Sequence, residues 1–417
     1  MLPLHIVAVA MVSATWMAST FLIPVLAKKR FEAADWKVLL VAMAPTSLFV
    51  LSIFWNDLFG RRTLGKYLGV YWLLASAPLG LIGLAQGYWG LLIPYLLACI
   101  GSAGYHPVAG ELLKGLYPDK VRGRVYSVVW GGSTVIGAGV GFGMGEWLAK
   151  DGDAFRMIFP ALAAVQGIGV GLMYFLWRAT GHAGKRAPYA GEPWSLRQAL
   201  DPIVHMRSVL KDDPVFLRYE GAYMTYGVGW MICWALVPIL VTTKLGLPYD
   251  QIAKSTQVAY LLAMVAAIVP AGMLMDRIGP VRSTAVSFAF LAVHPIGLMM
   301  VSNDHELLLV SLAYGAAHAG ANLGWMLGPV ALAPSKEKVA QYVAIHATLV
   351  GVRGTIFQGV GMGLYWMTGS FFWPLALAAA AYVWSAVQMW RLNGFMGARL
   401  KRSVPTPDPV IADPEVE

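Results

Sequence analysis

The sequence predicts an all-α integral membrane protein with twelve transmembrane helices. Of its 417 residues, 58% are hydrophobic and only 13% are charged, and apolar runs long enough to cross a bilayer recur from end to end. Soluble domains carry roughly 25% charged residues, and a helix needs about 20 apolar residues to span the hydrocarbon core. Because lipid cannot satisfy backbone amides, each run should form a complete helix.

Each expected span ends where charged or turn-forming residues return. The first run starts near His5 without a basic segment before it or a small-residue cleavage site after it, so we expect a span and not a removable signal peptide. The twelve expected spans are residues 5–27, 36–55, 66–86, 89–113, 125–148, 155–177, 216–243, 257–275, 283–302, 307–331, 342–367 and 372–392.

One long polar segment, residues 178–215, divides the chain. In it, Ser195 and Gln198 form a capping-box pattern that predicts a short amphipathic helix. Asp213 and Pro214 form an N-cap and N1 pair that should open the seventh span. The expected domains are an N-terminal six-helix bundle at 1–177, a cytoplasmic linker at 178–215, a C-terminal six-helix bundle at 216–392 and a disordered cytoplasmic tail at 393–417.

The distribution of positive charge predicts the orientation. With the N-terminus inside, most of the 31 Lys and Arg residues lie in cytoplasmic segments. The run Lys28-Lys29-Arg30 is a local exception and falls outside. We therefore expect an inner or plasma membrane protein with both termini in the cytoplasm, and the net charge of +9 indicates topology and not nucleic-acid binding. Cys99 and Cys233 fall within spans, so no disulfide is expected.

A polar motif follows an apolar run once in each half of the chain. Its copies are Asp57-Leu-Phe-Gly60-Arg61-Arg62 and Gly272-Met-Leu-Met-Asp276-Arg277-Ile-Gly279-Pro-Val-Arg282. The loops at residues 118–126 and 334–342 form a second pair, since each runs from a proline through basic residues to a tyrosine. In both pairs, the second copy follows the first after nearly the same number of residues. This common offset predicts two pseudo-symmetric halves.

In these features the whole chain resembles the major facilitator superfamily of secondary transporters. That family has twelve helices in two six-helix halves, a long cytoplasmic connector and the loop motif G-x-x-x-D-[RK]-x-G-[RK]-[RK]. The first copy here departs from the motif at Ile53 and Leu58, and the second has Pro280-Val281 after its glycine. The duplicated motif is specific for the superfamily but carries almost no information about the substrate.

The motif residues suit a gate at the membrane boundary. Gly60 and Gly279 permit tight turns, and an aspartate suits the N-terminus of a neighbouring helix. The resemblance implies that Asp57 meets the start of span eleven and Asp276 the start of span five, closing the cytoplasmic side until the halves rock. Simple anchoring of the topology is the alternative. The expected gating residues are Asp57, Gly60, Arg61, Arg62, Gly272, Asp276, Arg277, Gly279 and Arg282.

The resemblance also implies a substrate cavity near the midplane, lined by spans 1, 4, 7 and 10, with contributions from spans 5, 8 and 11. Independently, polar and aromatic residues recur on these spans at helical spacing, and polar groups within a bilayer are costly unless paired or hydrated. Helix packing or interfacial anchoring is the alternative for each. The expected cavity residues are Trp16, His106, Tyr226, Trp230, Tyr314, His318, Asn322 and Arg353. His294, in span nine, is expected outside the cavity.

Arg353 lies deep in span eleven between Gly351 and Gly354. A guanidinium there should bind an anionic or strongly polar substrate, or pair with a carboxylate or with backbone carbonyls. No Asp or Glu is expected at mid-span, because Glu111, Glu146 and Glu220 all fall near span ends. This shortage of carboxylates favours a substrate or backbone carbonyls as its partner.

These features predict secondary active or facilitative transport of a small polar or anionic organic solute by alternating access. Span five has Gly137-Ala138 in place of the Gly-Pro pair typical of drug/proton antiporters. A histidine could still carry a coupling proton, and facilitated diffusion stays open. We expect membrane lipid as a partner, a monomer, and neither cofactor nor metal. A non-transporting receptor or assembly factor, efflux of amphiphilic compounds, and a membrane enzyme are the alternatives. The chain contains no H-E-x-x-H, G-x-S-x-G or phosphate-binding loop that an enzyme would need.

Overall fold

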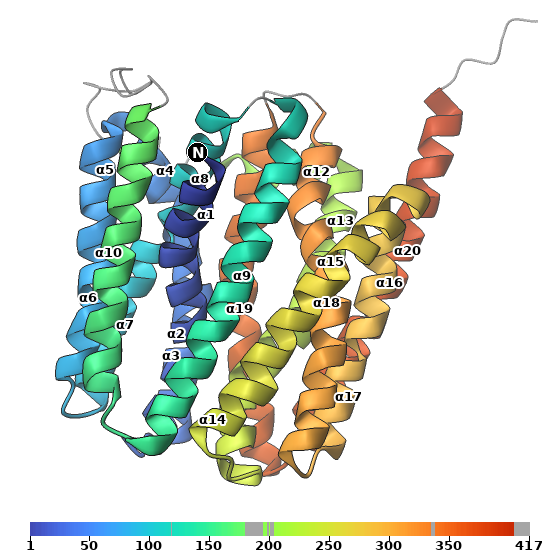
Figure 1. The fold of residues 1–417 in the computed structure, drawn as a ribbon. Helices are drawn as coiled ribbons and strands as arrows, with labels where there is room; N and C mark the ends of the chain where they lie inside the picture. Colours follow the sequence, from blue (N-terminus) through green and yellow to red (C-terminus); the bar gives the residue numbers. More distant parts are fainter. Residues whose placement is uncertain (118, 180–194, 198–199, 201–203, 335–337, 404–417) are drawn as a thin grey trace, which may run out of the picture.

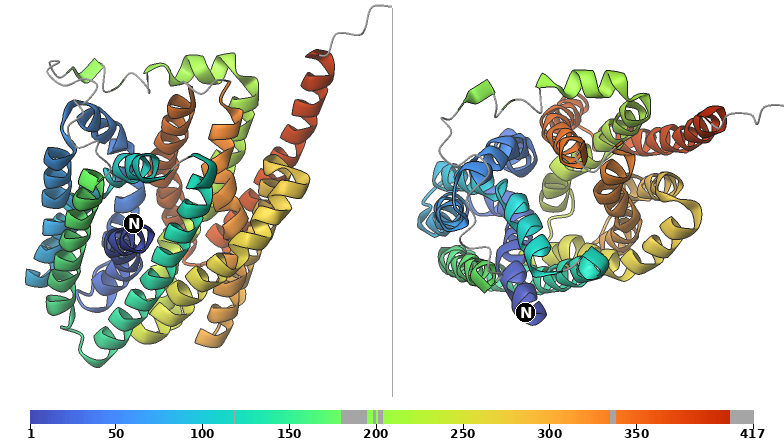
Figure 2. Two further views of the ribbon diagram at one scale, coloured as in Figure 1. Left: turned by 45° about the horizontal axis from the view of Figure 1, so that its top comes forward. Right: turned by 90° about the horizontal axis from the view of Figure 1, so that it is seen from above.

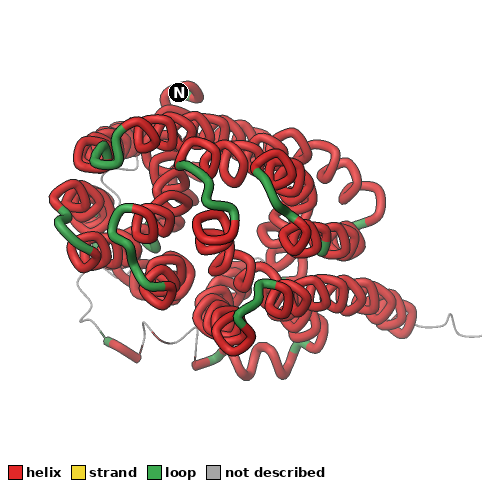
Figure 3. Tube along the Cα trace, turned by 90° about the horizontal axis from the view of Figure 1, so that it is seen from below, coloured by secondary structure: helices red, strands yellow, loops and turns green. Residues whose placement is uncertain are grey.

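The computed structural model describes the chain except for residues 118, 180–194, 198–199, 201–203, 335–337 and 404–417. Every regular element in this part is a helix (Figure 3), which confirms the all-helical class. Among the described residues, ten helical stretches are long and apolar enough to cross a membrane. They are Leu2–Lys29, Leu64–Leu84, Val128–Lys150, Phe155–Ala179, Pro214–Lys244, Tyr249–Ile278, Pro280–Met300, Asp304–Leu332, Gln341–Thr368 and Phe372–Met396.

Several of these stretches consist of helices joined end to end (Figure 1). The N-terminal half has α1 (Leu2–Val9), the π-helical η1 (Ala10–Ala14), α2 (Thr15–Lys29), α3 (Asp35–Ser47), the 3₁₀ turn η2 (Leu48–Leu51), α4 (Ser52–Arg61), α5 (Leu64–Tyr71), the π-helical η3 (Trp72–Ser76), α6 (Ala77–Leu81), the 3₁₀ turn η4 (Ile82–Leu84), α7 (Tyr88–Ser102), α8 (Tyr105–Leu116), α9 (Asp119–Lys150) and α10 (Phe155–Ala179). The C-terminal half has α12 (Met206–Asp212), α13 (Pro214–Ile239), the π-helical η5 (Leu240–Lys244), α14 (Tyr249–Ile252), the π-helical η6 (Ala253–Val258), α15 (Ala259–Ile278), α16 (Pro280–Leu291), α17 (Val293–Met300), α18 (Asp304–Leu332), α19 (Val339–Thr368) and α20 (Phe372–Ser403).

Two expected spans, 36–55 and 89–113, are divided into shorter helices. In the first, Pro45 lies inside α3, and the 3₁₀ turn η2 follows it. A proline inside a helix removes a backbone donor and crowds the preceding turn, which accounts for this change of helix type. In the second, α7 ends at Ser102 and α8 begins at Tyr105. Neither span is one continuous helix, so the twelve-span arrangement stays a prediction.

The start of α13 has the predicted N-cap. The Asp213 carboxylate accepts hydrogen bonds from the backbone N–H groups of Val215 and Phe216, at 3.0 and 3.1 Å, and Pro214 occupies the first helical position. The same carboxylate accepts from the Tyr342 hydroxyl at 2.9 Å, which holds the start of α19 beside the start of α13. Residue 198, part of the predicted capping box, lies outside the described residues.

The two motif glycines differ in conformation. Gly279, between α15 and α16, has a φ of +85°, so this turn favours glycine as expected. The expectation of a turn at Gly60 is wrong, because α4 continues through it to Arg61, and Arg62 makes the turn with extended backbone. Any residue adopts that conformation, so no glycine is needed there.

The gating role itself stays a prediction. Asp276, Arg277 and Arg282 are exposed where α15 and α16 meet, and Arg62 is exposed after α4. The side chain of Asp57 and the side chains at the start of α9 lie outside the described part of the structure, so the expected contacts of Asp57 and Asp276 are untested.

Contacts between the two halves lie mainly away from the end of the molecule that holds α12, here called the α12 end. The helices of the two halves diverge toward the α12 end and converge toward the opposite end, here called the far end (Figures 1 and 2). Trp234 Nε1 donates to the Ala42 carbonyl at 3.0 Å, and Gln358 Nε2 donates to Thr46 Oγ1 at 2.7 Å. In this conformation hydrogen bonds from α13 and α19 to α3 join the halves, and α9 also packs against α14 and η6.

Three basic residues at the far end each have a partner. Lys28 pairs with Asp35 at 2.6 Å, and Arg30 pairs with Asp153 at 2.8 Å. The hydrogen bond from Arg30 lowers the pKa of Asp153 from its ordinary value. Lys29 crosses between the halves, because its Nζ donates to the Leu247 carbonyl at 2.6 Å. The run Lys28-Lys29-Arg30, which is the exception to the predicted distribution of positive charge, thus makes two ion pairs and one contact between the halves.

Candidate substrate site

An aromatic stripe runs along α13, formed by Tyr219, Tyr223, Tyr226 and Trp230. Neighbouring ring centroids in the stripe are 4.9 to 6.0 Å apart. The first two residues bind α18: the Tyr219 hydroxyl donates to the Gly324 carbonyl at 2.7 Å, and the Tyr223 hydroxyl donates to that of Ala321 at 3.0 Å. Part of the stripe therefore packs helices together, and its other end, at Tyr226 and Trp230, reaches His318 and Arg353.

His318, on α18, is buried between two tyrosine hydroxyls. Its Nε2 lies 3.0 Å from the Tyr226 hydroxyl, and its Nδ1 lies 2.7 Å from that of Tyr260 on α15. Tyr314 stacks on the imidazole with centroids 5.3 Å apart. Since a neutral imidazole has one donor and one acceptor, both ring nitrogens are satisfied by the protein. A solute would reach them only by displacing a tyrosine.

Arg353, on α19, is fully buried in an aromatic cage. Its guanidinium carbon lies 5.7 to 5.9 Å from the ring centroids of Tyr223, Tyr226 and Trp230. Nη1 donates to the Tyr223 carbonyl at 2.9 Å. Among the described residues, Nε and Nη2 have no hydrogen-bond partner. A buried cation with unfilled donors is costly, so these two N–H groups mark where an acceptor can bind.

Glycines make room for this arginine. A Cβ at Gly227 on α13 would meet the Arg353 side chain, and Cβ atoms at Gly351 and Gly354 would meet Val50 and Thr46 of the N-terminal half. The glycines that flank the arginine therefore let α19 approach the N-terminal half, as small residues do between membrane helices. Arg353 consequently lies close to the junction of the two halves.

A buried acid–histidine pair lies one heptad before Arg353. His346 Nδ1 lies 2.8 and 2.9 Å from the two carboxylate oxygens of Glu220, and both residues are 2% exposed. Glu220 lies close to the start of α13, which begins at Pro214, so it falls near a span end as expected. Its buried partner was not predicted, because His346 belongs to α19, a helix distant in sequence. The sequence signal was the heptad spacing of His346 and Arg353.

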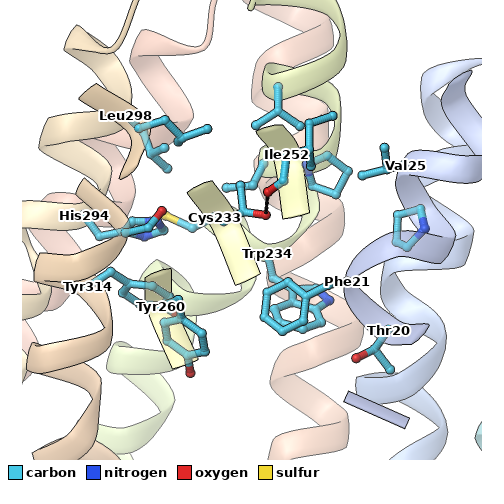
Figure 4. A pocket seen from close by; sticks show the side chains of 17 residues that line it. Thr20, Phe21, Val25, Cys233, Trp234, Ile252, Tyr260, His294, Leu298 and Tyr314 are labelled. Carbon is cyan, nitrogen blue, oxygen red and sulfur yellow. Dashed lines mark hydrogen bonds between the residues drawn. The ribbon is translucent and has the colours of Figure 1, made fainter. Parts of the chain in front are cut away.

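A cavity of about 60 Å³ lies between α2 of the N-terminal half and the C-terminal half (Figure 4). Phe21 and Trp234 meet at its wall with ring centroids 5.4 Å apart. His294 also lines it and stacks on Tyr314 with centroids 3.9 Å apart, while its expected place outside the substrate cavity stays a prediction. The volume suits a few water molecules. An organic solute would need the cavity to open.

The structure brings some of the expected cavity residues together and leaves others apart. Tyr226, Trp230, Tyr314, His318 and Arg353 form one connected group. Trp16 is half-buried and stacks on Tyr95 within the N-terminal half, with centroids 6.0 Å apart. Asn322 is half-buried on α18. The His106 side chain lies outside the described part of the structure. The connected group therefore lies within the C-terminal half.

One comparison with known proteins identifies the family, and another confirms the fold. The family model of the Major Facilitator Superfamily matches residues 6–362. A peptide transporter POT in complex with alafosfalin superposes with a TM-score of 0.77 at 12% identity, covering 96% of this chain and 95% of that one. A POT family transporter in complex with 5-aminolevulinic acid gives 0.70 at 12% identity, covering 94% and 96%. A nucleoside transporter, NupG, gives 0.71 at 12% identity, covering 93% and 98%. No curated protein matches by sequence. At such identities the superpositions show the fold alone.

Proposed function

The chain belongs to the Major Facilitator Superfamily, a family of transporters and not of enzymes, and on this premise we propose that it carries a small organic anion across a membrane by alternating access. The twelve spans form two six-helix bundles at 1–177 and 216–392, joined by the linker at 178–215. The α12 end faces the cytoplasm of a cell with an inner or plasma membrane. The expectation of disorder from residue 393 is wrong, because α20 continues to Ser403, and we place the C-terminus on the same side.

One observation carries the choice of an anion, namely the two unfilled donors of the buried Arg353 guanidinium. Among the described residues, no carboxylate lies within ion-pair distance of Arg353, so its charge is available to a ligand. A guanidinium presents donors in a planar fork that matches a carboxylate or another oxyanion. The surrounding rings suit a solute that also has an apolar part.

The contacts between the halves support alternating access. Lys29, Trp234 and Gln358 make hydrogen bonds between the halves, while the helices diverge toward the α12 end. We assign this conformation as one in which the halves are closed toward the outside, through these three hydrogen bonds. The cage covers Arg353 in this conformation, so the partly exposed Trp230 ring has to move for an anion to bind.

Counterflow in proteoliposomes tests the proposal. Liposomes containing the purified protein and loaded with one unlabelled solute should exchange it for the same labelled solute outside. The panel is lactate, 4-hydroxybenzoate and benzenesulfonate as anions, with uridine and dialanine as solutes that carry no net charge. We expect exchange of at least one anion, and Arg353→Gln should reduce it at least tenfold while the protein still elutes as a single species. Exchange of the uncharged solutes alone, or normal exchange by Arg353→Gln, would reject anion recognition by Arg353.

A further inference from the structure

The Glu220–His346 pair has the composition of a proton-binding site. Both groups are almost completely buried, and both carboxylate oxygens lie within hydrogen-bond distance of His346 Nδ1. An ionised carboxylate only accepts hydrogen bonds, so a neutral His346 paired with an ionised Glu220 would carry its proton on Nδ1 and its lone pair on Nε2. Among the described residues, that Nε2 is buried and without a hydrogen-bond partner. A proton-accepting atom is therefore left unfilled.

The pair belongs to the same cluster as Arg353. Tyr223 connects the two, because its carbonyl accepts from Arg353 while its ring lies edge-on to His346 with centroids 4.9 Å apart. Tyr219 also faces the imidazole, at 6.0 Å. From α18 the facing ring is Trp325, at 5.5 Å, which does not titrate.

The other ionisable groups around the pair are more distant or are occupied. Asp213 accepts from Tyr342 at the start of the helices, Tyr382 of α20 lies against Tyr226, and His318 lies beyond Tyr226. The charges of α12, at Arg207, Lys211 and Asp212, are exposed. From the N-terminal half, α3 and η2 present Thr46 and Val50 to α19. Among the side chains that the structure describes, Glu220 and Arg353 are thus the two charges that the buried cluster must balance.

Charge balance in this cluster links a proton to the anion. With Glu220 ionised and His346 neutral, the carboxylate and the guanidinium sum to zero. An anion bound at Arg353 would leave one uncompensated negative charge in a site of low dielectric constant, which is strongly unfavourable. One proton added to the pair restores neutrality. We propose that Glu220–His346 is the coupling site, and that it takes up one proton with each monoanion bound at Arg353.

This inference rests on the proposed transport of an anion. The proton adds to the lone pair of His346 Nε2 while Nδ1 stays hydrogen-bonded to Glu220, and it leaves when the anion is released on the other side. One positive and one negative charge cross together, so transport is electroneutral. A pH difference of one unit can then drive accumulation of about tenfold.

Benzenesulfonate is the decisive probe, because a sulfonate stays ionised throughout the pH range and any coupled proton must be carried by the protein. The test compares wild type with Glu220→Gln, and Glu146→Gln is the control, since Glu146 pairs with Lys150 at the surface. With acid outside, wild type and the control should accumulate the probe about tenfold per pH unit, independent of membrane potential. Glu220→Gln should keep counterflow, lose this accumulation and become sensitive to potential.

The outcomes separate the two proposals. Absence of counterflow with every anion of the panel rejects anion transport and the coupling with it. Counterflow in wild type without a response to the pH gradient rejects the coupling alone, and so does a normal gradient response in Glu220→Gln. If benzenesulfonate is not exchanged, lactate takes its place in the same comparison. If Glu220→Gln fails to fold, a second experiment replaces the comparison. The exchanged anion is added to detergent-solubilised wild type in weak buffer, and the protons taken up on binding are measured. Uptake of about one proton per anion is expected, and no proton uptake would overturn the inference.

Discussion

Gly227 on α13 lies directly against the side chain of Arg353 on α19. A Cβ added to Gly227 would meet the aliphatic part of the arginine, with Cγ at 3.1 Å and Nε at 3.2 Å. The position of the guanidinium therefore depends on the absence of a side chain on a different helix. The aromatic cage and the Tyr223 carbonyl can engage the arginine only because α13 leaves this space.

Gly227→Ala is expected to move the guanidinium and reduce anion exchange at least tenfold, because an arginine acting through a fork of donors tolerates little displacement. Gly221→Ala is the matched control on the same helix, since a Cβ there meets nothing within 4 Å. Alanine stabilises a helix relative to glycine by about 1 kcal/mol, so the control should melt no lower than wild type. Counterflow and thermal unfolding measure the two effects, and equal exchange by both variants would contradict the prediction.

The two glycines of the C-terminal motif should respond differently to alanine. Gly279→Ala places a side chain at a φ of +85° and should lower stability by about 1–2 kcal/mol. Gly272→Ala lies within α15, where a Cβ meets nothing within 4 Å, and should be neutral or stabilising. Thermal unfolding in detergent checks both. Equal melting temperatures would show that the turn at Gly279 does not need glycine.

Trp234→Phe removes the indole donor to the Ala42 carbonyl but keeps a ring beside Phe21. A lost hydrogen bond of about 1 kcal/mol should shift the conformational equilibrium about fivefold away from closure at the far end. Spin labels at Asp151→Cys and Ser302→Cys, on exposed loops of opposite halves, report the separation at that end. An unchanged distance distribution would exclude this hydrogen bond as a latch.

Asp153 gives a pH dependence with a definite sign. Arg30 lowers the pKa of the Asp153 carboxyl, so the folded state binds this proton less readily than the unfolded chain. The ion pair therefore contributes stability above the ordinary pKa of an aspartate, near 4, and loses it as the pH falls through the lowered pKa. Asp153→Asn should melt slightly lower than wild type at pH 7 and equal to it at acid pH. If the two melting temperatures still differ at acid pH, the ion pair is not the cause of the difference.

Local and periodic signals predicted much of the fold. Asp213 caps α13 because an N-cap needs only its own side chain and the next two residues. The apolar runs predicted helices because a bilayer allows few alternatives. The division of spans 36–55 and 89–113 and the continuation of α4 through Gly60 were missed, because a proline or a glycine within a helix has several outcomes that depend on packing.

The sequence by itself determined that this is an all-helical membrane protein with a repeated loop motif and an arginine deep within one apolar run, because composition, periodicity and motif spacing are properties of the chain alone. Only the tertiary structure decided what surrounds that arginine. Glu220 and His346 are 126 residues apart, and Gly227 and Arg353 lie on different helices. No local pattern encodes which faces of α13 and α19 meet, because helix packing depends on the shape and volume of all the side chains between them. That packing placed the buried proton-accepting pair beside the buried cation.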